Sequence, residues 1–427
     1  MNFDLVSDLE RRGLVHQTTA PELKALLASE PITAYIGFDP TAASLHVGSL
    51  LQICLLMRLQ RAGHRPIGLV GGGTGLIGDP SGKQSERPML TPEKLEENLA
   101  GIRGQLERFL DFSGPRGAIV INNADWLCRL NLVSFLRDIG KHFSVNAMVA
   151  RDSVKMRLES REQGISYTEF SYALLQAYDF LELYDRFGCR LQMGGSDQWG
   201  NIVAGTDLIR RLRGTTAFGL TSPLVTRSDG AKFGKSEHGN VWLDESLTSP
   251  FELYQFWLNT ADGDVGRYLA YFTFLPFERL EELAAAVASN PQEREAQRVL
   301  AAELTRMVHG EEALARALHT TEVLFEGREL TELSAQQMEE AFRTFEATEL
   351  PRAALGTAEA ALPTLLAASG LVPSKGQART AITGGGVYVN NRRVAEPSYV
   401  VDAADLLNER FVVLRRGKKA YHVVRIG

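Results

Sequence analysis

Cysteine is scarce in this chain, with three among 427 residues. Cys54, Cys128 and Cys189 are far apart and form no CxxC pair, which disfavours a disulfide framework or a zinc site and favours buried thiols in a reducing compartment. Long apolar runs are also missing. The longest stretch without Asp, Glu, Lys or Arg, residues 40–57, contains proline, histidine and several hydroxyl groups and is no membrane span. The acidic start Met1–Asp4 does not resemble a signal peptide, so a cytoplasmic location is expected.

Positive charge is low overall and gathers at one end of the chain. The 46 Lys and Arg face 52 Asp and Glu, a net charge of −6, which by itself disfavours a nucleic-acid partner. Residues 363–427, however, carry ten basic and four acidic side chains, so this tail has a net charge of +6 and the remainder −12. The asymmetry indicates that the tail binds a different partner from the rest of the chain.

The first half of the chain alternates short apolar strands with amphipathic helices. We expect strands at Thr33–Ile36, Ile67–Val70 and Ala118–Ile121 and a long helix over Leu45–Gln60. Strands separated by helices indicate an α/β fold with a parallel sheet, whose ligands bind beyond the carboxyl ends of the strands.

Strand signals disappear from Pro250 to about Phe345. Helical patterns cover Glu281–Ala288, Pro291–Val308 and Glu311–Leu324, which predicts an all-helical domain over residues 250–345. The alanine-rich residues 346–362 are predicted to form a linker.

The basic tail, residues 363–427, has the pattern of a small α+β module. A helix is expected over Leu365–Ser369, a turn at Gly384–Gly386 and a strand at Val387–Val389. Two further strands, Phe411–Leu414 and Tyr421–Val424, are predicted to pair as a hairpin.

One motif favours a dinucleotide site only superficially. Gly73–Gly78 matches GxGxxG after a strand, but the pyrophosphate of a dinucleotide needs a helix to begin there. The residues that follow, Asp79–Gly82, are typical of a turn and not of a helix start. We therefore expect the glycines to let the backbone approach a ligand, with Asp79 directed into the cleft.

Two other motifs suit a polyphosphate. Leu45–Ser49 lies at the start of the first long helix, where a helix amino end attracts phosphate. Asp229–Ser236 places Lys232 and Lys235 in a glycine-containing loop that can grip and release a charged ligand. Taken alone, His46 is better explained as a helix cap or a surface residue, and a solvated basic loop is an open alternative for residues 229–236.

Together the two motifs resemble the HIGH and KMSKS signatures of the class I aminoacyl-tRNA synthetases. The segments between them narrow the resemblance to the bacterial tyrosyl-tRNA synthetase family, and it covers essentially the whole chain. The five matching segments are Tyr35–Thr41, Gly75–Ser81, Tyr172–Asp179, Gly194–Asn201 and Lys232–Ser236.

The resemblance implies a Rossmann-like catalytic domain (1–222), a connection with the KFGKS loop (223–249), a helical anticodon-arm domain (250–345), a linker (346–362) and an S4-like RNA-binding domain (363–427). It also implies a homodimer with the activity of a tyrosine–tRNA ligase. Such an enzyme converts L-tyrosine and ATP to tyrosyl-adenylate and pyrophosphate, then transfers the tyrosyl group to the 3′-terminal ribose of tRNA(Tyr). Mg²⁺ would accompany ATP, and no protein-held metal is expected.

Site residues follow from the resemblance, position by position. Tyr35 and Asp179 would bind the substrate phenol, while Asp79, Tyr172 and Gln176 would bind its ammonium and Gln198 its carboxylate. The adenylate and ATP would contact Asp39, His46, Gly48, Ser49, Gly195, Asp197, Lys232, Lys235 and Ser236. The catalytic set for the phosphates would be Thr41, His46, Lys83, Arg87, Lys232 and Lys235.

The tail would bind RNA through Lys375, Arg379, Arg392, Arg393, Arg415, Arg416, Lys418 and Lys419, although a solvated basic face has the same composition. Arg210, Arg211 and Arg213 form a weaker candidate surface for the acceptor stem.

Two positions depart from the family pattern. Ser49 replaces the second histidine of HIGH, so no second imidazole acts there, and Ile36 replaces a frequent cysteine, which removes one polar contact to the ribose. Three alternatives stay open: a tryptophanyl-tRNA synthetase, a small nucleotidyltransferase with an HxGH-type site, and a non-catalytic RNA-binding protein on a synthetase scaffold.

Overall fold

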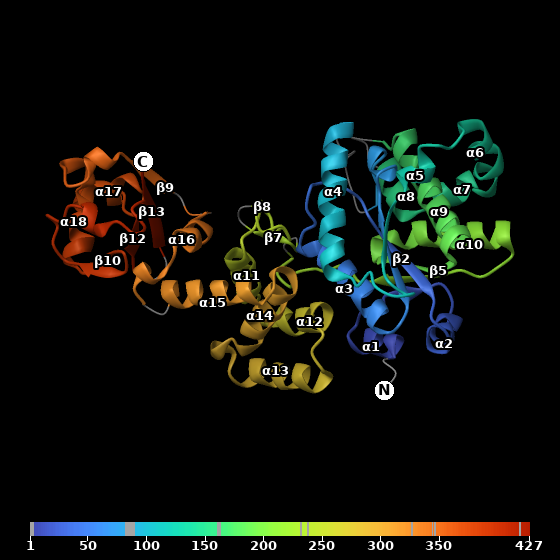
Figure 1. Cartoon of the computed structure of the whole chain (residues 1–427), viewed down its shortest axis with the longest axis horizontal. Coiled ribbons are helices and arrows are strands. Elements are labelled where there is room, and N and C mark those ends of the chain that lie inside the picture. The colour runs from blue at the N-terminus through green and yellow to red at the C-terminus, as the bar shows by residue number, and fades with distance from the viewer. Residues whose placement is uncertain are drawn as a thin grey trace. The chain divides into compact units, whose positions relative to one another are not determined.

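The computed structural model describes residues 4–81, 90–159, 164–230, 233–236, 239–325, 328–343, 345, 347–417 and 420–427. It contains two compact units (Figure 1). The first comprises Met1–Leu247 and Thr260–Leu300, and the second Thr248–Asn259 and Ala301–Gly427. Among the described residues, no helix is both long and apolar enough to cross a membrane.

The first unit is built on a six-stranded sheet with the order β1-β6-β5-β2-β3-β4. Its strands are β1 (Gln17–Thr18), β2 (Thr33–Phe38), β3 (Arg65–Val70), β4 (Ile119–Asn122), β5 (Cys189–Gly195) and β6 (Phe218–Ser222). β1 pairs antiparallel with β6, whereas the other neighbours in this order are parallel. The α/β prediction is confirmed. The strand order reverses between β2 and β5, which is where a sheet of this kind binds its ligands.

Helices pack on both faces of this sheet. The helices of the first unit are α1 (Leu5–Arg11), α2 (Glu22–Ser29), α3 (Val47–Arg61), α4 (Pro92–Phe109), α5 (Ala124–Leu127), α6 (Leu132–Asp138), α7 (Val145–Val149), α8 (Asp152–Glu159), α9 (Tyr167–Phe187), α10 (Trp199–Arg213), α12 (Asp262–Phe272) and α13 (Phe277–Ser289). Tyr35 and Ile67 share a buried core with Phe180 of α9 and Leu208 of α10. Gly68 faces the other side, where Leu106 of α4 lies within 3.1 Å of the position that a Cβ would take.

The sequence explains how the long helix α9 begins and ends. The Ser166 hydroxyl accepts a hydrogen bond from the Glu169 N–H at its amino end, and Gly188 ends it in the left-handed conformation with φ of 61°. Tyr172, Gln176 and Asp179 lie between these ends at spacings of four and three residues. They therefore occupy neighbouring turns on one side of the helix.

The second unit joins helices to a smaller sheet. Its helices are α11 (Pro250–Leu258), α15 (Glu311–Phe325), α16 (Ala335–Phe342), α17 (Leu362–Ala368) and α18 (Lys375–Thr383), while α14 (Glu295–His309) has residues in both units. The five strands follow the order β11-β10-β12-β13-β9. They are β9 (Ala347–Leu350), β10 (Val387–Val389), β11 (Arg392–Val394), β12 (Phe411–Arg416) and β13 (Ala420–Ile426), and the predicted hairpin is β12–β13.

The predicted linker, residues 346–362, is wrong. Residues 347–350 form β9, which pairs in parallel with β13, and Leu350, Ala354, Ala360 and Leu362 are buried in the core of the tail module. The alanine-rich composition suggested a flexible connection, but these small side chains fit closely packed turns.

Two helical expectations are also corrected. The predicted helix Pro291–Val308 is interrupted, because Arg294 has φ of 50° between a 3-10 turn at Pro291–Glu293 and α14. The predicted all-helical domain 250–345 is divided, since α12 and α13 belong to the first unit and α11 and α15 to the second. Helical periodicity identifies a helix but not the unit against which it packs.

Candidate active site

The bottom of the candidate tyrosine pocket lies between β2, β4 and α9. Asp179 is 1% exposed, and its two carboxylate oxygens accept hydrogen bonds from Trp126 Nε1 at 2.7 Å and Asn123 Nδ2 at 2.9 Å. Burial raises the pKa of Asp179 to about 7, against the lowering effect of both hydrogen bonds. The carboxylate is therefore held in place and close to its protonation midpoint at neutral pH.

The side chain of Tyr35 lies beside this carboxylate. Its hydroxyl is buried and has no partner among the described residues, and its ring packs on Phe180 with a centroid distance of 5.3 Å. Burial, with a smaller effect of the Asp179 charge, raises the pKa of Tyr35 well above its ordinary value, so the hydroxyl stays protonated. A buried hydroxyl without a partner is unfavourable, so this position favours a ligand that can complete the hydrogen bond.

A second set of polar groups forms one chain of hydrogen bonds. Gln198 Nε2 donates to Asp79 Oδ2 at 2.7 Å, and Gln198 Oε1 accepts from Gln176 Nε2 at 3.1 Å and Asn201 Nδ2 at 3.3 Å. The Ser81 N–H donates to the other oxygen of Asp79 at 2.9 Å. The structure thus brings together three of the predicted tyrosine-binding side chains.

Tyr172 has a partner that the sequence analysis did not assign to it. Its hydroxyl donates to Asp39 Oδ2 at 2.9 Å, while Thr74 donates to Asp39 Oδ1 at 3.2 Å. Gly71 allows this close approach, since a Cβ there would lie 2.4 Å from Asp39 Oδ1. The residues predicted to bind the ammonium and the adenylate therefore meet at this contact.

His46 lies at the amino end of α3, as predicted, and is its N-cap residue. Its Nδ1 accepts the Gly48 N–H at 3.0 Å, so a neutral ring carries its proton on Nε2. Residues on both sides are held by backbone bonds: the Val47 N–H donates to Val241 O at 2.9 Å and the Leu243 N–H to Leu45 O at 2.8 Å. The imidazole is thus fixed at the amino end of α3, where the helix dipole favours an anion.

The described part of the KFGKS loop lies against this helix start. A Cβ at Gly234, whose φ is 81°, would lie 3.5 Å from the backbone nitrogen of Gly48. Phe233 packs on Tyr268 and Phe272 of α12, with centroid distances of 5.2 and 5.8 Å. The backbone of Lys235 and Ser236 forms β7, which pairs with β8 (Gly239–Asn240). The loop therefore reaches the predicted phosphate side.

The remaining predicted ATP contacts lie at the open side of the site. Thr41 and Asp197 are exposed, and Ser49 is half-buried in the first turn of α3. Gly195 ends β5, where a Cβ would lie 2.6 Å from Asp197 Oδ1. Side chains of Lys235 and Ser236, and all of Lys83, Arg87, Lys232, Lys418 and Lys419, lie outside the described residues.

The predicted RNA-binding side chains divide into groups. Lys375 and Arg379 are exposed on α18. Arg393 and Arg415 lie across from Tyr388 on adjacent strands, and the Arg415 guanidinium is 3.8 Å from the Tyr388 ring centroid. Cations beside aromatic rings suit nucleic acid. Arg392 instead pairs with Glu329 at 2.9 Å, and Arg416 donates to Leu371 O at 2.8 Å.

The candidate acceptor-stem surface is less basic than its sequence suggests. Arg210 and Arg211 both pair with Asp207, at 2.5 and 2.6 Å, and Arg213 pairs with Asp185.

A cavity of about 640 Å³ lies beside this part of α10 and is not the predicted tyrosine pocket. The described residues contain no cluster of three His, Cys, Asp or Glu arranged to hold a metal ion.

Sequence analysis missed Asn123, Trp126 and Thr74. Asn123 donates to both Asp179 and Thr74, at 2.9 and 3.0 Å, and so links the two halves of the site. The available signal was the position of Asn123 just after a predicted strand, where side chains reach the ligand edge of a parallel sheet.

Comparisons with known proteins agree with this geometry. Residues 27–326 match the family model for "tRNA synthetases class I (W and Y)", and residues 340–424 match that for the "Tyrosine--tRNA ligase SYY-like C-terminal domain". The chain is 52% identical to the tyrosine–tRNA ligase of Bacillus caldotenax over 99% of this chain and 100% of that protein. It is 51% identical to that of Roseiflexus castenholzii over 99% of each.

A solved structure shows the same arrangement. A C-terminally truncated mitochondrial tyrosyl-tRNA synthetase of Aspergillus nidulans is 32% identical, with a TM-score of 0.69, over 75% of this chain and 94% of that chain. The C-terminal match and the full-length relatives favour tyrosine over tryptophan as the amino acid of the family. The chain belongs to the tyrosine–tRNA ligase family of class I aminoacyl-tRNA synthetases.

Proposed function

We propose that this chain activates L-tyrosine with ATP and charges tRNA(Tyr), with the substrate phenol bound between Tyr35 and Asp179. The observation that carries the proposal is the buried Tyr35 hydroxyl, which has no partner among the described residues and lies next to a carboxylate whose two oxygens are fixed by Asn123 and Trp126. A phenol can accept from Tyr35 and donate to Asp179, whereas phenylalanine would leave the Tyr35 hydroxyl unpaired and would offer Asp179 no further donor. A site built to hydrogen-bond a substrate hydroxyl discriminates strongly against an analogue that lacks it, so no separate editing step is needed.

The other end of the amino acid would bind to the Asp79–Gln198–Gln176 chain of hydrogen bonds. Asp79 complements the ammonium, and Gln198 can turn an amide N–H toward the carboxylate. Because that carboxylate is already ionised at neutral pH, its attack on the α-phosphorus needs no general base. A bond forms between the carboxylate oxygen and the α-phosphorus, the bond from that phosphorus to the bridging oxygen breaks, and pyrophosphate leaves with the electron pair.

Catalysis would then depend on positioning and on stabilising the phosphate charge. His46 Nε2–H would donate to the phosphates, together with the hydroxyl groups of Thr41 and Ser49, and Gly48 would let the ligand approach the start of α3. Lys83, Arg87, Lys232 and Lys235 would supply cations, and Mg²⁺ would accompany ATP. Asp39, Asp197, Gly195 and Ser236 would bind the adenosine and phosphate side of the adenylate.

Tyrosine-dependent exchange of pyrophosphate into ATP tests this assignment. We expect exchange with tyrosine and little with phenylalanine or tryptophan, and Asp179→Asn should reduce the preference for tyrosine over phenylalanine. Unchanged preference in a folded variant would refute the phenol site. Lys235→Ala should slow adenylate formation while leaving tyrosine affinity nearly unchanged, and equal losses in both would refute its role in the transition state.

We further propose that the tail module binds tRNA through the Arg393, Tyr388 and Arg415 row together with Lys375 and Arg379. Three basic or aromatic side chains at one level of the sheet provide stacking surfaces and charge. Arg392 pairs with Glu329 and Arg416 donates to Leu371 O, and neither lies in this row, so we assign them a smaller share; Arg415 also donates to Gly417 O but stays beside the Tyr388 ring.

A homodimer is proposed from an exposed apolar surface on the first unit, here called the α6–α9 patch. It comprises Leu132, Val133, Leu136, Val145, Val149, Leu158 and Tyr167, with exposed fractions from 37% to 74%. Apolar side chains exposed to this extent are costly in water and are typical of a protein interface. The three free cysteines suit the reducing cytoplasm, where tRNA and ATP are available.

A further inference from the structure

The segment that leads into His46 is held by a helix that no motif of the sequence singled out. Residues Pro40–Leu45, here called the approach segment, connect Asp39 at the end of β2 to His46 at the start of α3. α4, the long cyan helix in Figure 1, packs against this segment with three residues: Asn98, Gly101 and Gln105. Their spacings of three and four residues place them on one face of the helix.

Gln105 fixes the end of the approach segment next to His46. Its Oε1 accepts the Leu45 N–H at 2.8 Å, and its Nε2 donates to Ser44 Oγ at 2.8 Å. Ser44 Oγ in turn donates to Leu45 O at 2.7 Å. Gln105 and Ser44 are 2% and 3% exposed, so water cannot easily replace these bonds.

Asn98 and Gly101 fix the rest of the approach segment. Asn98, which is 0% exposed, donates from Nδ2 to Pro40 O at 2.9 Å. A Cβ at Gly101 would lie 1.9 Å from the carbonyl oxygen of Ala43. Any other residue at position 101 would push the helix and the segment apart. By contrast, a Cβ at Gly104 would meet nothing within 4 Å.

We propose that Asn98, Gly101 and Gln105 form a buried template that positions Thr41 and His46 for the phosphates of ATP. The three are positioning residues and touch no substrate themselves. The template acts from both ends of the approach segment, because Pro40 follows Asp39 directly and Leu45 precedes His46. It rests on the proposed function, in which Thr41 and His46 contact the phosphates.

Two glycine substitutions on α4 provide a matched pair. Gly101→Ala and Gly104→Ala add the same methyl group to the same helix, and alanine favours helix formation at both positions. We expect Gly101→Ala to slow tyrosyl-adenylate formation by about tenfold or more, because displacements of about 1 Å are costly in phosphate chemistry. Tyrosine affinity should stay within about twofold. Gly104→Ala should leave both quantities unchanged.

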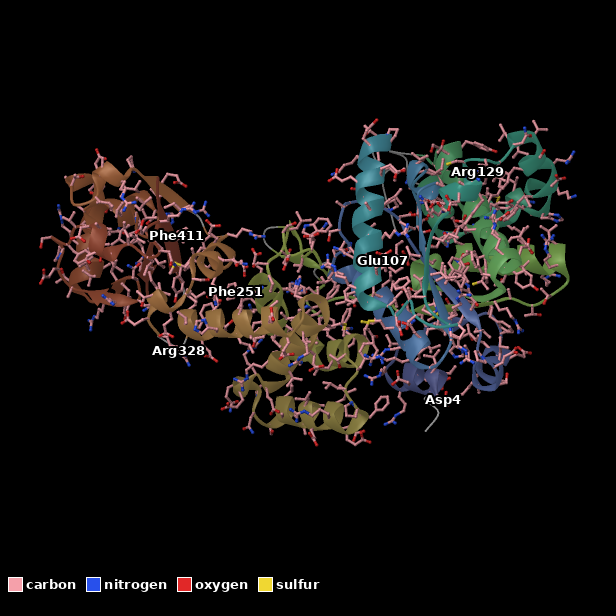
Figure 2. The ribbon with its side chains drawn as sticks, in the orientation of Figure 1. Asp4, Glu107, Arg129, Phe251, Arg328 and Phe411 are labelled. Carbon is pink, nitrogen blue, oxygen red and sulfur yellow. The ribbon has the colours of Figure 1, made fainter. Side chains whose placement is uncertain are left out.

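A second variant keeps the test informative if Gly101→Ala does not fold. Gln105→Met removes the amide at similar volume, and Gln105→Glu restores an acceptor for the Leu45 N–H. We expect slow adenylate formation in Gln105→Met and partial recovery in Gln105→Glu. Leu106→Ala, which truncates a buried side chain facing Gly68, controls for lost stability alone. Glu107, the next residue of α4 and labelled in Figure 2, is exposed. Glu107→Gln should therefore change neither adenylate formation nor tyrosine affinity.

His46→Ala separates this proposal from the proposed function. If His46→Ala forms adenylate at the normal rate, the phosphate assignment itself is wrong. If His46→Ala is slow but folded Gly101→Ala and Gln105→Met are both normal, the template is wrong and the assignment stands. In the double variant, His46→Ala with Gln105→Met, the two losses should be clearly less than multiplicative, because Gln105 acts through His46. Fully multiplicative losses would contradict that coupling.

Discussion

At the bottom of the pocket, the side chains of the neighbouring residues Asp179 and Tyr35 differ in how many hydrogen bonds the fold gives them. Asp179 has a hydrogen bond to each oxygen, whereas the Tyr35 hydroxyl has none from the described residues. The Asp179 carboxylate, which accepts hydrogen bonds, is thus fixed in position, whereas the Tyr35 hydroxyl can still donate a hydrogen bond to a ligand. A tyrosine substrate fits that asymmetry because its phenol both donates and accepts.

The raised pKa of Asp179, about 7, predicts a pH-dependent stability. In the unfolded chain this carboxyl has its ordinary lower pKa, so the folded state binds the proton more tightly, and stability falls as the pH rises from about 4 to about 7. Asp179→Asn removes this dependence. Between pH 5 and pH 8, the free energy of unfolding of Asp179→Asn should therefore rise by about 2 kcal/mol relative to that of the unsubstituted chain. This is the order of magnitude that the pKa difference gives. Urea unfolding at the two pH values measures this, and an equal effect at both would contradict it.

Asn123→Ala tests the hydrogen bond that stabilises ionised Asp179. Its loss should raise the pKa of Asp179 further and weaken tyrosine binding at neutral pH by about tenfold, as expected for a bond to a charged group. The defect should shrink at about pH 9, where Asp179 is ionised in both proteins. Equilibrium dialysis with tyrosine measures both affinities. A defect of equal size at both pH values would show that Asn123 acts only through packing.

At this scale the sequence predicted much of the site, because its motifs are contiguous. The motifs contain Asp39, Tyr172, Gln176, Asp79 and Gln198. One hydrogen bond joins Tyr172 to Asp39, and a separate chain of hydrogen bonds joins Gln176, Gln198 and Asp79. The Asp39–Tyr172 bond could not be predicted, since it joins residues 133 positions apart. Asn123 and Trp126 were missed for the same reason, because only the folded sheet brings them to Asp179.

At the scale of elements, a buried ionic cluster joins α1, α3 and the end of α12. Asp8 pairs with Arg12 at 2.8 Å and with Arg58 at 3.0 Å, and Arg58 Nη2 also donates to Thr273 O. The same end of α12 carries Phe272, which packs on Phe233 of the KFGKS loop. Burial, the largest cause, lowers the pKa of Arg58 to about 10, so its charge depends on this single carboxylate and the surrounding carbonyls.

Asp8→Asn should therefore destabilise the first unit strongly. Removing one partner of a buried ion pair leaves an uncompensated charge, which costs about 3–5 kcal/mol. The exposed pair Lys24–Glu10 provides the control, since Glu10→Gln should cost less than about 1 kcal/mol. Denaturant unfolding compares the two variants. Similar losses in both would contradict the assignment of the cluster as a buried anchor.

Element boundaries were predicted within a few residues where the apolar pattern was strong. The predicted helix Leu45–Gln60 is α3, Val47–Arg61, and the predicted strand Thr33–Ile36 is extended to Phe38. The template on α4 was not predicted, because buried Asn98 and Gln105 have the composition of a solvated helix face. Their role depends on the approach segment, to which only tertiary structure brings them.

At the scale of the whole molecule, the α6–α9 patch predicts the oligomeric state. Val133, which is 72% exposed, is the most exposed aliphatic side chain in that patch. Val133→Asp should convert a dimer to a monomer in light scattering, because burying an unpaired carboxylate at an apolar interface is unfavourable. Phe112→Asp, an exposed apolar position outside the patch, should leave the mass unchanged. A chain that is monomeric before substitution would contradict the proposed dimer.

The corrected tail boundary changes how tRNA binding should be tested. A chain ended after Leu362 would keep β9 and the buried Leu350 and Ala360 without the sheet that covers them. A chain ended after Arg343 avoids this exposure. We expect tyrosine-dependent pyrophosphate exchange to survive in the chain ended after Arg343 and tRNA charging to be lost, whereas the chain ended after Leu362 should be more prone to aggregate. Normal tRNA charging by the chain ended after Arg343 would show that the tail has a function other than tRNA binding.

The parallel pairing of β9 with β13 has a consequence for synthesis of the protein. β9 leaves the ribosome long before Ala420–Ile426 exist, so its partner is missing while the intervening residues are made. Contacts between such distant segments form late and slowly. The six-stranded sheet of the first unit lies wholly within residues 17–222 and can form earlier. A newly made chain therefore acquires the six-stranded sheet of its first unit first and the five-stranded sheet of its tail last.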